Sequence, residues 1–177
     1  VKTPVMTPAD LKGLKIRTMD SPMAIEMMNC FGGSATAMPI SDVYTAMQSG
    51  VIDGAENNET ALTVGGHGEV AKCYSYDEHT RIPDIVLIST KVWNQFSVEQ
   101  QEIVQAAADA AKETYKADWQ AAIEQAVKDA ETNMGVTFYH PDSLAPFQEA
   151  VQPIYDRLAK EEPEVWALCE KIQAFQA

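Results

Sequence analysis

LKIRTMDSPMAIEMMNCFGGSATAMPISDVYTAMQSGVIDGAE, residues 14–56, is the stretch that decides the fold. Its first five residues, 14–18, alternate apolar and polar side chains as a half-buried strand does. Ser21 and Pro22 then form a helix cap followed by a proline at the first helical position, which predicts a helix over 22–31. Two successive glycines end that helix.

The second part of the stretch repeats this alternation. Residues 34–38 predict a short strand that Pro39 closes, and Ser41 caps a helix predicted over 42–49. Residues 51–56 predict a third strand. Strands that alternate with helices form parallel sheets with crossover helices, so the sequence predicts an α/β fold of the periplasmic binding protein kind, with a parallel-type sheet.

The rest of the chain adds three predicted strands, at 72–80, 84–90 and 136–140. The middle one, DIVLIST, is a nearly continuous apolar run suited to a buried position. Two closing helical segments follow the last strand, and prolines mark a kink and a restart there.

One long helix is predicted between the last two strands. Ser97 and Gln100 form a capping box, and neither glycine nor proline follows until Gly135. At about 1.5 Å per residue such a helix approaches roughly 55 Å, more than a small domain spans. It therefore either bends or bridges two lobes.

Composition and charge exclude several classes of partner. The chain has 177 residues, 46% of them hydrophobic, which can fill one core or two small ones. The formal net charge of -13 argues against nucleic acid and membrane surfaces as partners. No apolar run approaches the roughly 20 residues that span a bilayer, and the N-terminus lacks a signal-peptide pattern, so the chain as given is expected to be soluble.

Cysteines and histidines predict neither a metal site nor a cofactor. Cys30, Cys73 and Cys169 lack CxxC spacing and are expected to be small buried apolar residues. His67 and Glu69 have a spacing that a metal could use, but no third ligand accompanies them and a solvated loop is favoured. The chain also lacks the glycine motifs GxxxxGK and GxGxxG that bind phosphates.

Polar residues gather where the predicted strands end. Arg17 ends the first strand, Ile40 follows the second, and Glu56, Asn57 and Asn58 follow the third. The carboxyl ends of parallel strands face the same edge of a sheet, where ligands of open α/β folds collect. A guanidinium beside side-chain amides suits an anionic small molecule that carries hydroxyl groups.

Position alone leaves two roles for Arg17. The guanidinium can bind a ligand, or it can form a structural ion pair with Asp20 or Glu56. A family resemblance shifts the balance toward the ligand.

Three segments carry that resemblance: DLKGLKIRTMDSP, TAMPISDVYTAMQSGVIDGAEN and LISTKVWNQFSVEQQEIVQAAADAA. They strongly resemble the periplasmic substrate-binding subunits of tripartite ATP-independent periplasmic (TRAP) transporters, the DctP type. The K-x-R, M-P-x-S-x-V-Y-x-A-x-Q-x-G and D-G-x-E-N elements occur here in the order and spacing of that family.

The resemblance implies a set of site residues. The family's K-x-R arginine binds the substrate carboxylate and matches Arg17, and the asparagine of D-G-x-E-N matches Asn57. Ile40 stands where relatives often have an aromatic residue, which argues against ring stacking. His79 and Arg81 lie where the chain would cross back between lobes and are candidate donors, although a structural hydrogen bond is the commoner role of a lone histidine. The predicted ligand-binding residues are Arg17, Asp20, Ser21, Ile40, Asn57, Asn58, His79 and Arg81.

Members of this family are about twice as long as the chain, and the resemblance starts in their middle. It therefore implies the C-terminal half of a two-lobed protein. Residues 1–82 and 123–177 are expected to build the second lobe, and 83–122 to belong to the first. A strand without its sheet leaves an open apolar edge, so self-association of the chain is also expected.

The implied function is capture of a small organic acid in the periplasm and its delivery to the membrane permease subunits of a TRAP transporter, without catalysis. DGAENN and YSYDEHTR are similar to members that bind sugar acids such as uronates. Two alternatives stay open: a small enzyme that uses a cysteine and a histidine, and an effector-sensing domain of a regulator. No nucleophile elbow, HExxH motif or DNA-binding segment supports either one.

Overall fold

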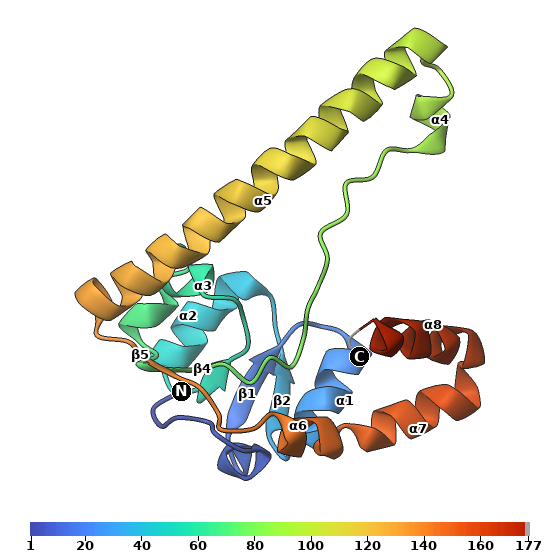
Figure 1. Ribbon diagram of the computed structural model, residues 1–177. Helices are drawn as coiled ribbons and strands as arrows, with labels where there is room; N and C mark the ends of the chain where they lie inside the picture. The colour runs from blue at the N-terminus through green and yellow to red at the C-terminus, as the bar shows by residue number, and fades with distance from the viewer. Residues whose placement is uncertain (176–177) are drawn as a thin grey trace.

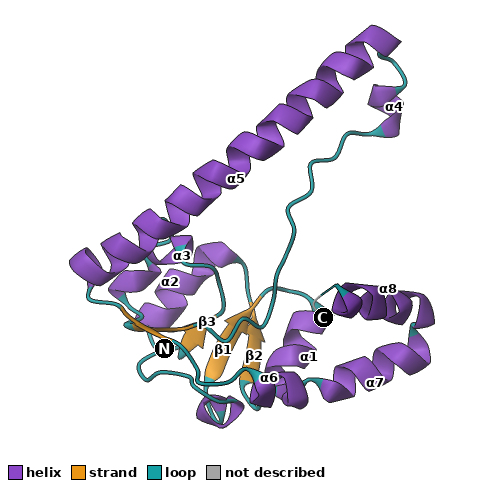
Figure 2. Ribbon diagram, viewed as in Figure 1, coloured by secondary structure: helices purple, strands orange, loops and turns teal. Residues whose placement is uncertain are grey.

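Three short parallel strands form the central sheet in the computed structural model, which describes residues 1–175. The middle strand β1 (Lys15–Thr18) pairs with β2 (Ser34–Ala37) on one side and with β3 (Gly54–Ala55) on the other. The predicted parallel α/β arrangement is confirmed (Figure 2). The third strand is shorter than 51–56, since the N–H groups of Val51 and Ile52 donate to the Ala46 carbonyl and the side chain of Asp53 accepts the Lys15 N–H at 2.8 Å.

Two helices connect these strands, as predicted. α1 (Pro22–Cys30) begins at the Ser21 cap, whose hydroxyl accepts the Ala24 N–H. α2 (Ile40–Gln48) begins one residue before Ser41. The prediction that Ser41 caps this helix is therefore wrong, since Ser41 lies inside the first turn and its hydroxyl donates to Asp42 at 3.0 Å.

The main core lies between α1, the sheet and the C-terminal helices. Within residues 1–175, three helices rather than two follow the last strand: α6 (Ala145–Ala150), α7 (Gln152–Glu161) and α8 (Pro163–Ala174). Each has a proline in its first turn, where the missing N–H costs no hydrogen bond. The buried residues of this core are Val5, Leu11, Ile16, Met27, Met28, Phe31, Phe147, Ile154 and Leu158.

A second, smaller core lies under a two-stranded parallel sheet of β4 (Cys73–Ser75) and β5 (Thr137–Tyr139). Leu62 of α3 (Thr60–Thr63) packs there against the end of the long helix and Val136. Both strands occur within predicted segments. The short 3-10 helix η1 (Pro8–Leu11) precedes β1, and a second one, η2 (His67–Glu69), precedes β4.

An arm, residues 83–122, projects from this compact body (Figure 1). An extended segment leads to α4 (Thr90–Trp93), and α5 (Val98–Met134) returns along 37 residues to the second core. The predicted capping box at its start and the glycine cap at its end are confirmed. No described helix, α5 included, is long and apolar enough to cross a membrane.

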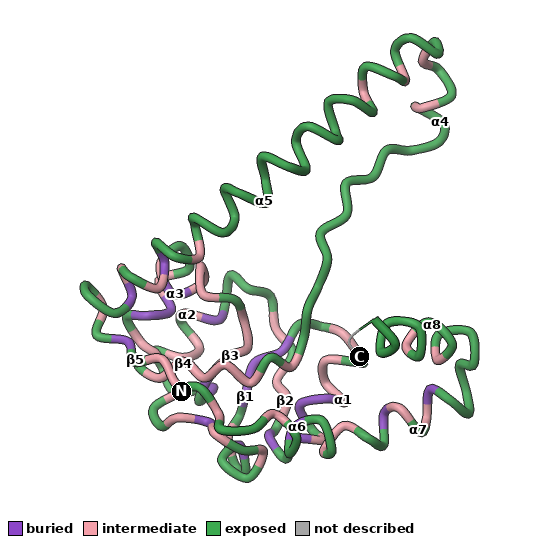
Figure 3. Tube along the Cα trace, viewed as in Figure 1, coloured by how far each residue is buried: buried purple, intermediate pink, exposed green. Residues whose placement is uncertain are grey.

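The arm has no buried residue, and its tube in Figure 3 is green except for a few pink stretches near α4 and the start of α5. Val86 is 92% exposed and Leu87 is 85% exposed. Residues 84–90 therefore form no strand in the described chain, whereas the exposed apolar surface expected of a strand without its sheet is present. A strand needs a neighbour for its N–H and C=O groups, and none of residues 1–175 pairs with this segment.

Candidate functional site

Arg17 joins the ends of all three strands of the central sheet. Its residue is only 5% exposed, and its Nε donates to the carbonyl oxygen of Met38, just after β2, at 3.0 Å. Its Nη1 approaches Glu56 Oε1, just after β3, at 3.4 Å. The two contacts fix the plane of the guanidinium at the carboxyl edge of the sheet, as the sequence predicts.

These contacts leave part of the guanidinium free. The group has five N–H donors, and Nη2 has no hydrogen-bond partner among residues 1–175. The Glu56 contact is long for a charged hydrogen bond, which is usually about 2.7–2.9 Å. A buried cation that is only partly paired is costly, so the arrangement favours an anion as a further partner.

His79 lies on the other side of Glu56. Its Nδ1 is 2.5 Å from Asp77 Oδ1, and its Nε2 is 3.9 Å from Glu56 Oε2, too far for a hydrogen bond. Burial opposes the charged imidazolium, but hydrogen bonding and the negative charges of Asp77 and Glu56 outweigh it and raise the pKa of His79 to about 9. His79 is therefore cationic at neutral pH and offsets the charge of Glu56, so Arg17 keeps its attraction for an anion.

The two asparagines after β3 differ in what they hold. Asn57 accepts the Tyr74 hydroxyl through its carbonyl oxygen at 2.9 Å, and its side-chain Oδ1 accepts the Asn58 N–H at 2.9 Å. Its Nδ2 has no partner in the described part of the chain. The side-chain oxygen of Asn58 instead binds the start of α3, where it accepts hydrogen bonds from the Thr60 N–H and hydroxyl. Neither asparagine's Nδ2 has a partner within residues 1–175, so both amides can donate, but only Asn58 is tied to α3.

The structure brings only some of the predicted residues together. Of the two carboxylates considered as ion-pair partners, Arg17 pairs with Glu56 and not with Asp20. Asp20, Ile40 and Arg81 are exposed and make no hydrogen bond or ion pair with this group within residues 1–175. Ser21 caps α1. Asp77 was missed, although an acid two residues before a histidine is a visible signal.

A protein-family comparison identifies the family of this chain. The model of the bacterial extracellular solute-binding proteins, family 7 (DctP), matches residues 1–162. The chain belongs to this family. The resemblance read from the three segments is thereby confirmed.

Relatives of known structure carry the same fold. A TRAP periplasmic solute-binding protein of Anaerococcus prevotii, with bound α/β-D-glucuronate, matches with a TM-score of 0.91 at 40% identity, over 98% of this chain and 56% of its own. One from Xanthobacter autotrophicus, with bound β-D-galacturonate, matches with a TM-score of 0.88 at 38% identity, over 98% of this chain and 57% of its own.

A sequence relative shows the same coverage. The uncharacterized protein YiiZ of Salmonella typhimurium is 49% identical over 172 residues, which are 97% of this chain and 52% of that protein. The chain thus spans about half the length of the relatives that it matches.

His67 departs from the prediction of a solvated loop. It is only 5% exposed, and burial together with the charge of Arg17 lowers its pKa. Glu69 is exposed and accepts the Tyr44 hydroxyl at 2.7 Å, so it does not join His67 in a metal site. No group of three or more metal-ligating side chains gathers within residues 1–175.

The cysteines are free thiols and only half-buried, rather than the fully buried residues expected. The Cys73 Sγ donates to the Lys2 carbonyl, and burial raises the pKa of the Cys30 thiol. No cysteine in the described chain is hydrogen-bonded to a histidine. The geometry therefore gives no support to a cysteine nucleophile.

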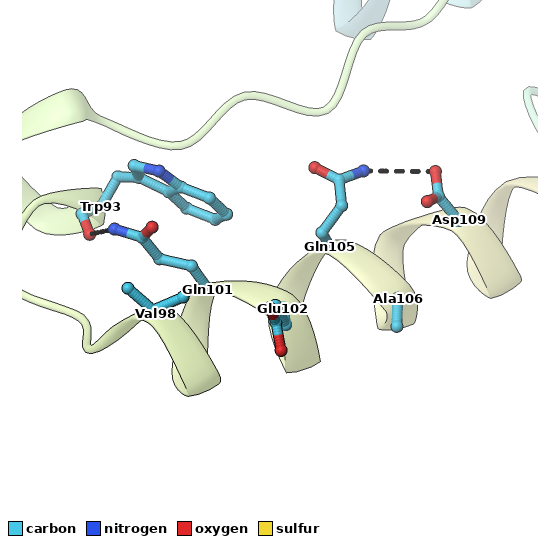
Figure 4. A pocket seen from close by; sticks show the side chains of 7 residues that line it. All are labelled: Trp93, Val98, Gln101, Glu102, Gln105, Ala106 and Asp109. Carbon is cyan, nitrogen blue, oxygen red and sulfur yellow. Dashed lines mark hydrogen bonds between the residues drawn. The ribbon is translucent and has the colours of Figure 1, made fainter.

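An open hollow lies far from Arg17, between α4 and the start of α5 (Figure 4). It is open, with a volume of about 440 Å³, and the Gln101 side chain spans its floor to the Trp93 carbonyl at 3.0 Å. Two of its lining residues are acidic and none is basic, so an organic anion would be repelled there. The lining residues are Trp93, Val98, Gln101, Glu102, Gln105, Ala106 and Asp109.

Proposed function

We propose that this chain is the C-terminal half of an extracytoplasmic solute-binding protein that captures a sugar acid of the uronate class for a TRAP transporter. The observation that carries the proposal is the buried Arg17 guanidinium with an unpaired Nη2. The solved relatives with bound glucuronate and galacturonate support the ligand class. Periplasmic location and delivery to membrane permease subunits belong to the same proposal.

The carboxylate of the sugar acid would accept two parallel N–H bonds from Arg17. Such a fork-to-carboxylate pair fixes both position and orientation, which a lysine ammonium cannot copy. The free Nδ2 of Asn57 would donate to a ring or hydroxyl oxygen of the sugar. The positive charge of His79 would compensate the negative charge of Glu56, so that the Arg17 guanidinium would still attract the ligand carboxylate.

The two-lobed organisation is also part of the proposal. Residues 1–82 and 123–177 would form one lobe, and the arm, 83–122, would pack into a second lobe supplied by an N-terminal part of the protein. The length of the relatives supports this N-terminal part, because the chain covers only 52% of YiiZ and 56% of the Anaerococcus protein. We call the chain joined to such an N-terminal part the two-lobed form.

Catalysis has no place in this proposal. The relatives are solute-binding proteins, and no cysteine–histidine pair exists in the described chain to support the enzyme alternative. The regulator alternative would need a DNA-binding surface, which a net charge of -13 opposes.

Calorimetric titration of the two-lobed form with glucuronate and galacturonate tests the ligand. We expect binding to both acids and none to glucose, which has the ring and hydroxyl groups but no carboxylate. Equal binding of glucose and glucuronate would refute the carboxylate role, and no binding of any sugar acid would refute the uronate class.

The chain alone tests the organisation. Half of a cleft should bind the same acids far more weakly than the two-lobed form, and the apolar arm should make the chain self-associate. Light scattering that finds a monomer at high concentration, with the arm still exposed to limited proteolysis, would contradict the expected pairing surface.

A further inference from the structure

His67 is a buried polar side chain that the proposed function does not use. It belongs to η2 and is 5% exposed, yet its imidazole makes no hydrogen bond with any of residues 1–175. A buried polar group without a partner costs free energy, and most such groups in proteins are satisfied by protein or by ordered water. We therefore ask which group outside residues 1–175 satisfies the imidazole.

A small cavity borders this imidazole. Its volume is about 40 Å³, and its wall includes His67, Asn57, Asn58 and Tyr74. Within residues 1–175, only Thr18 Oγ1 and His79 Nε2 are side-chain polar atoms that lack both a hydrogen-bond partner and solvent access. The ring nitrogens of His67 are not among them, so water can reach them. A cavity of at least about 10–15 Å³ with two to four polar partners can hold a water molecule.

The wall of the cavity offers suitable partners. Asn57 Nδ2 is a free donor, because only the Oδ1 of that side chain is engaged. The Tyr74 hydroxyl donates to the Asn57 carbonyl at 2.9 Å and keeps a lone pair to accept with. A neutral imidazole provides one donor and one acceptor, whichever tautomer is present.

We propose that this cavity is a binding site for ordered water, and that the water connects the His67 imidazole to the Asn57 side chain. His67 is then a positioning residue, which acts on the ligand only through Asn57. Of the other polar lining residues, Asn58 has its side-chain oxygen held by α3, and the Cys73 Sγ donates to the Lys2 carbonyl. Asn57 is part of the wall of this cavity, and Arg17 is not.

The charge environment agrees with this role. Burial and the positive charge of Arg17 lower the pKa of His67, which keeps the ring neutral and able both to accept and to donate. No carboxylate is hydrogen-bonded to the ring: Glu69, two residues on in η2, is exposed and engaged with Tyr44, and α3 contributes Leu62 and Ala61 to the wall. An imidazolium there would have lost its acceptor and would repel Arg17.

The water is tested directly, without a ligand. A high-resolution crystal structure should show ordered water within hydrogen-bond distance of a His67 ring nitrogen, and magnetic relaxation dispersion should show long-lived internal water. His67→Phe keeps a ring of similar size without nitrogens, and it should lose that long-lived signal. His140→Phe is the matched control, because that exposed ring stacks on Tyr76 at 4.6 Å and should leave the signal unchanged. An empty cavity in the wild-type protein would overturn the proposal, even if His67→Phe failed to fold.

The link to Asn57 rests on the proposed function and is tested by affinity. In the two-lobed form, His67→Phe should weaken binding of a uronate by roughly threefold to tenfold, as for one lost neutral hydrogen bond, and His67→Gln should restore part of it. Unchanged affinity in His67→Phe would refute the positioning role. If the wild-type protein bound no sugar acid, the proposed ligand would fail while the crystallographic test of the water would still decide this site.

Discussion

Two regions of the molecule each hold an arginine against a carboxylate, and they do so in opposite ways. In the seam between α1 and α7, Arg157 donates from Nε and Nη2 to both oxygens of Glu26, at 3.1 and 2.6 Å, and from Nη1 to Glu162 at 3.1 Å. At the edge of the central sheet, Arg17 has one long contact with Glu56 and a free Nη2. All three nitrogens are engaged at Arg157, but not at Arg17.

The better-paired arginine is the more exposed of the two. The Arg157 side chain is 31% exposed, whereas that of Arg17 is 6% exposed. Water can solvate an arginine at the surface, so complete pairing there adds little, while incomplete pairing in the interior costs free energy. The comparison supports the proposal that the incompletely paired, buried Arg17 binds the ligand, whereas the fully paired, more exposed Arg157 has a structural role.

Substitution of Arg17 should give the largest effect. In the two-lobed form, Arg17→Ala should weaken uronate binding by roughly 2–5 kcal/mol, the usual cost of removing one partner of a buried charged pair. Arg17→Lys should lose roughly 1.5–3 kcal/mol although the charge remains, because the parallel pair of bonds is gone. Calorimetric titration measures both.

Arg157→Lys is the matched control, since it makes the same change in the structural pair. It should leave uronate affinity unchanged. Equal affinity in wild type and Arg17→Lys would reject the bidentate contact, and a loss in Arg157→Lys as large as that in Arg17→Lys would erase the contrast between the two regions.

The pH dependence of stability should give the next effect, through His79. Its pKa rises from an ordinary 6.5 to about 9 in the folded protein, so the stabilisation is complete below about pH 6.5 and is lost as pH rises through about 9. The amount is on the order of 3 kcal/mol. Thermal melts of wild type and His79→Gln from pH 6 to 10 measure it. The variant should show a flatter profile, and parallel profiles would contradict a charged His79 beside Glu56.

The sequence predicts the central sheet well because local signals mark each of its elements. Ser21, the prolines and the paired glycines of residues 14–56 are caps and breaks that act within a few residues. At 84–90 the apolar pattern alone does not make a strand, because a strand needs a neighbour and the described chain supplies none. Ser41 shows the limit of such signals, since a helix can begin one residue before its apparent cap.

The sequence predicts the position of the candidate site but not which side chains contact each other there. Arg17 and Asn57 follow from position and from the family motif, whereas Asp77 and the burial of His67 depend on packing between distant elements. The loop GGHGEV is polar in sequence, yet Leu62, the end of α5 and Val136 form a core beside it. The two roles considered for Arg17 were also not exclusive, because it pairs with Glu56 and still retains a free donor nitrogen.

A smaller effect is expected at Asn57. Asn57→Ala should weaken uronate binding in the two-lobed form by about 0.5–1.5 kcal/mol, the range for one neutral hydrogen bond. Asn58→Ala is the neighbouring control, and it should lower the melting temperature through α3 with no loss of affinity in the folded protein. An affinity loss confined to Asn58→Ala would mean that the ligand contacts the second asparagine instead.

The smallest effect is expected in the α1–α7 seam. The hydrogen bonds from Arg157 lower the pKa of Glu26, so the stabilisation is present above the ordinary pKa of a glutamate and is lost as pH falls through the lowered value. Because both side chains are about one-third exposed, salt should screen the pair and the change should be close to the resolution of a thermal melt. Melts of wild type and Arg157→Lys at pH 7 and pH 3, in low and high salt, measure it, with a difference expected only at pH 7 in low salt. A large, salt-independent loss in Arg157→Lys would show that complete pairing at the surface can matter as much as incomplete pairing in the interior, and the contrast drawn between the two arginines would no longer identify the ligand site.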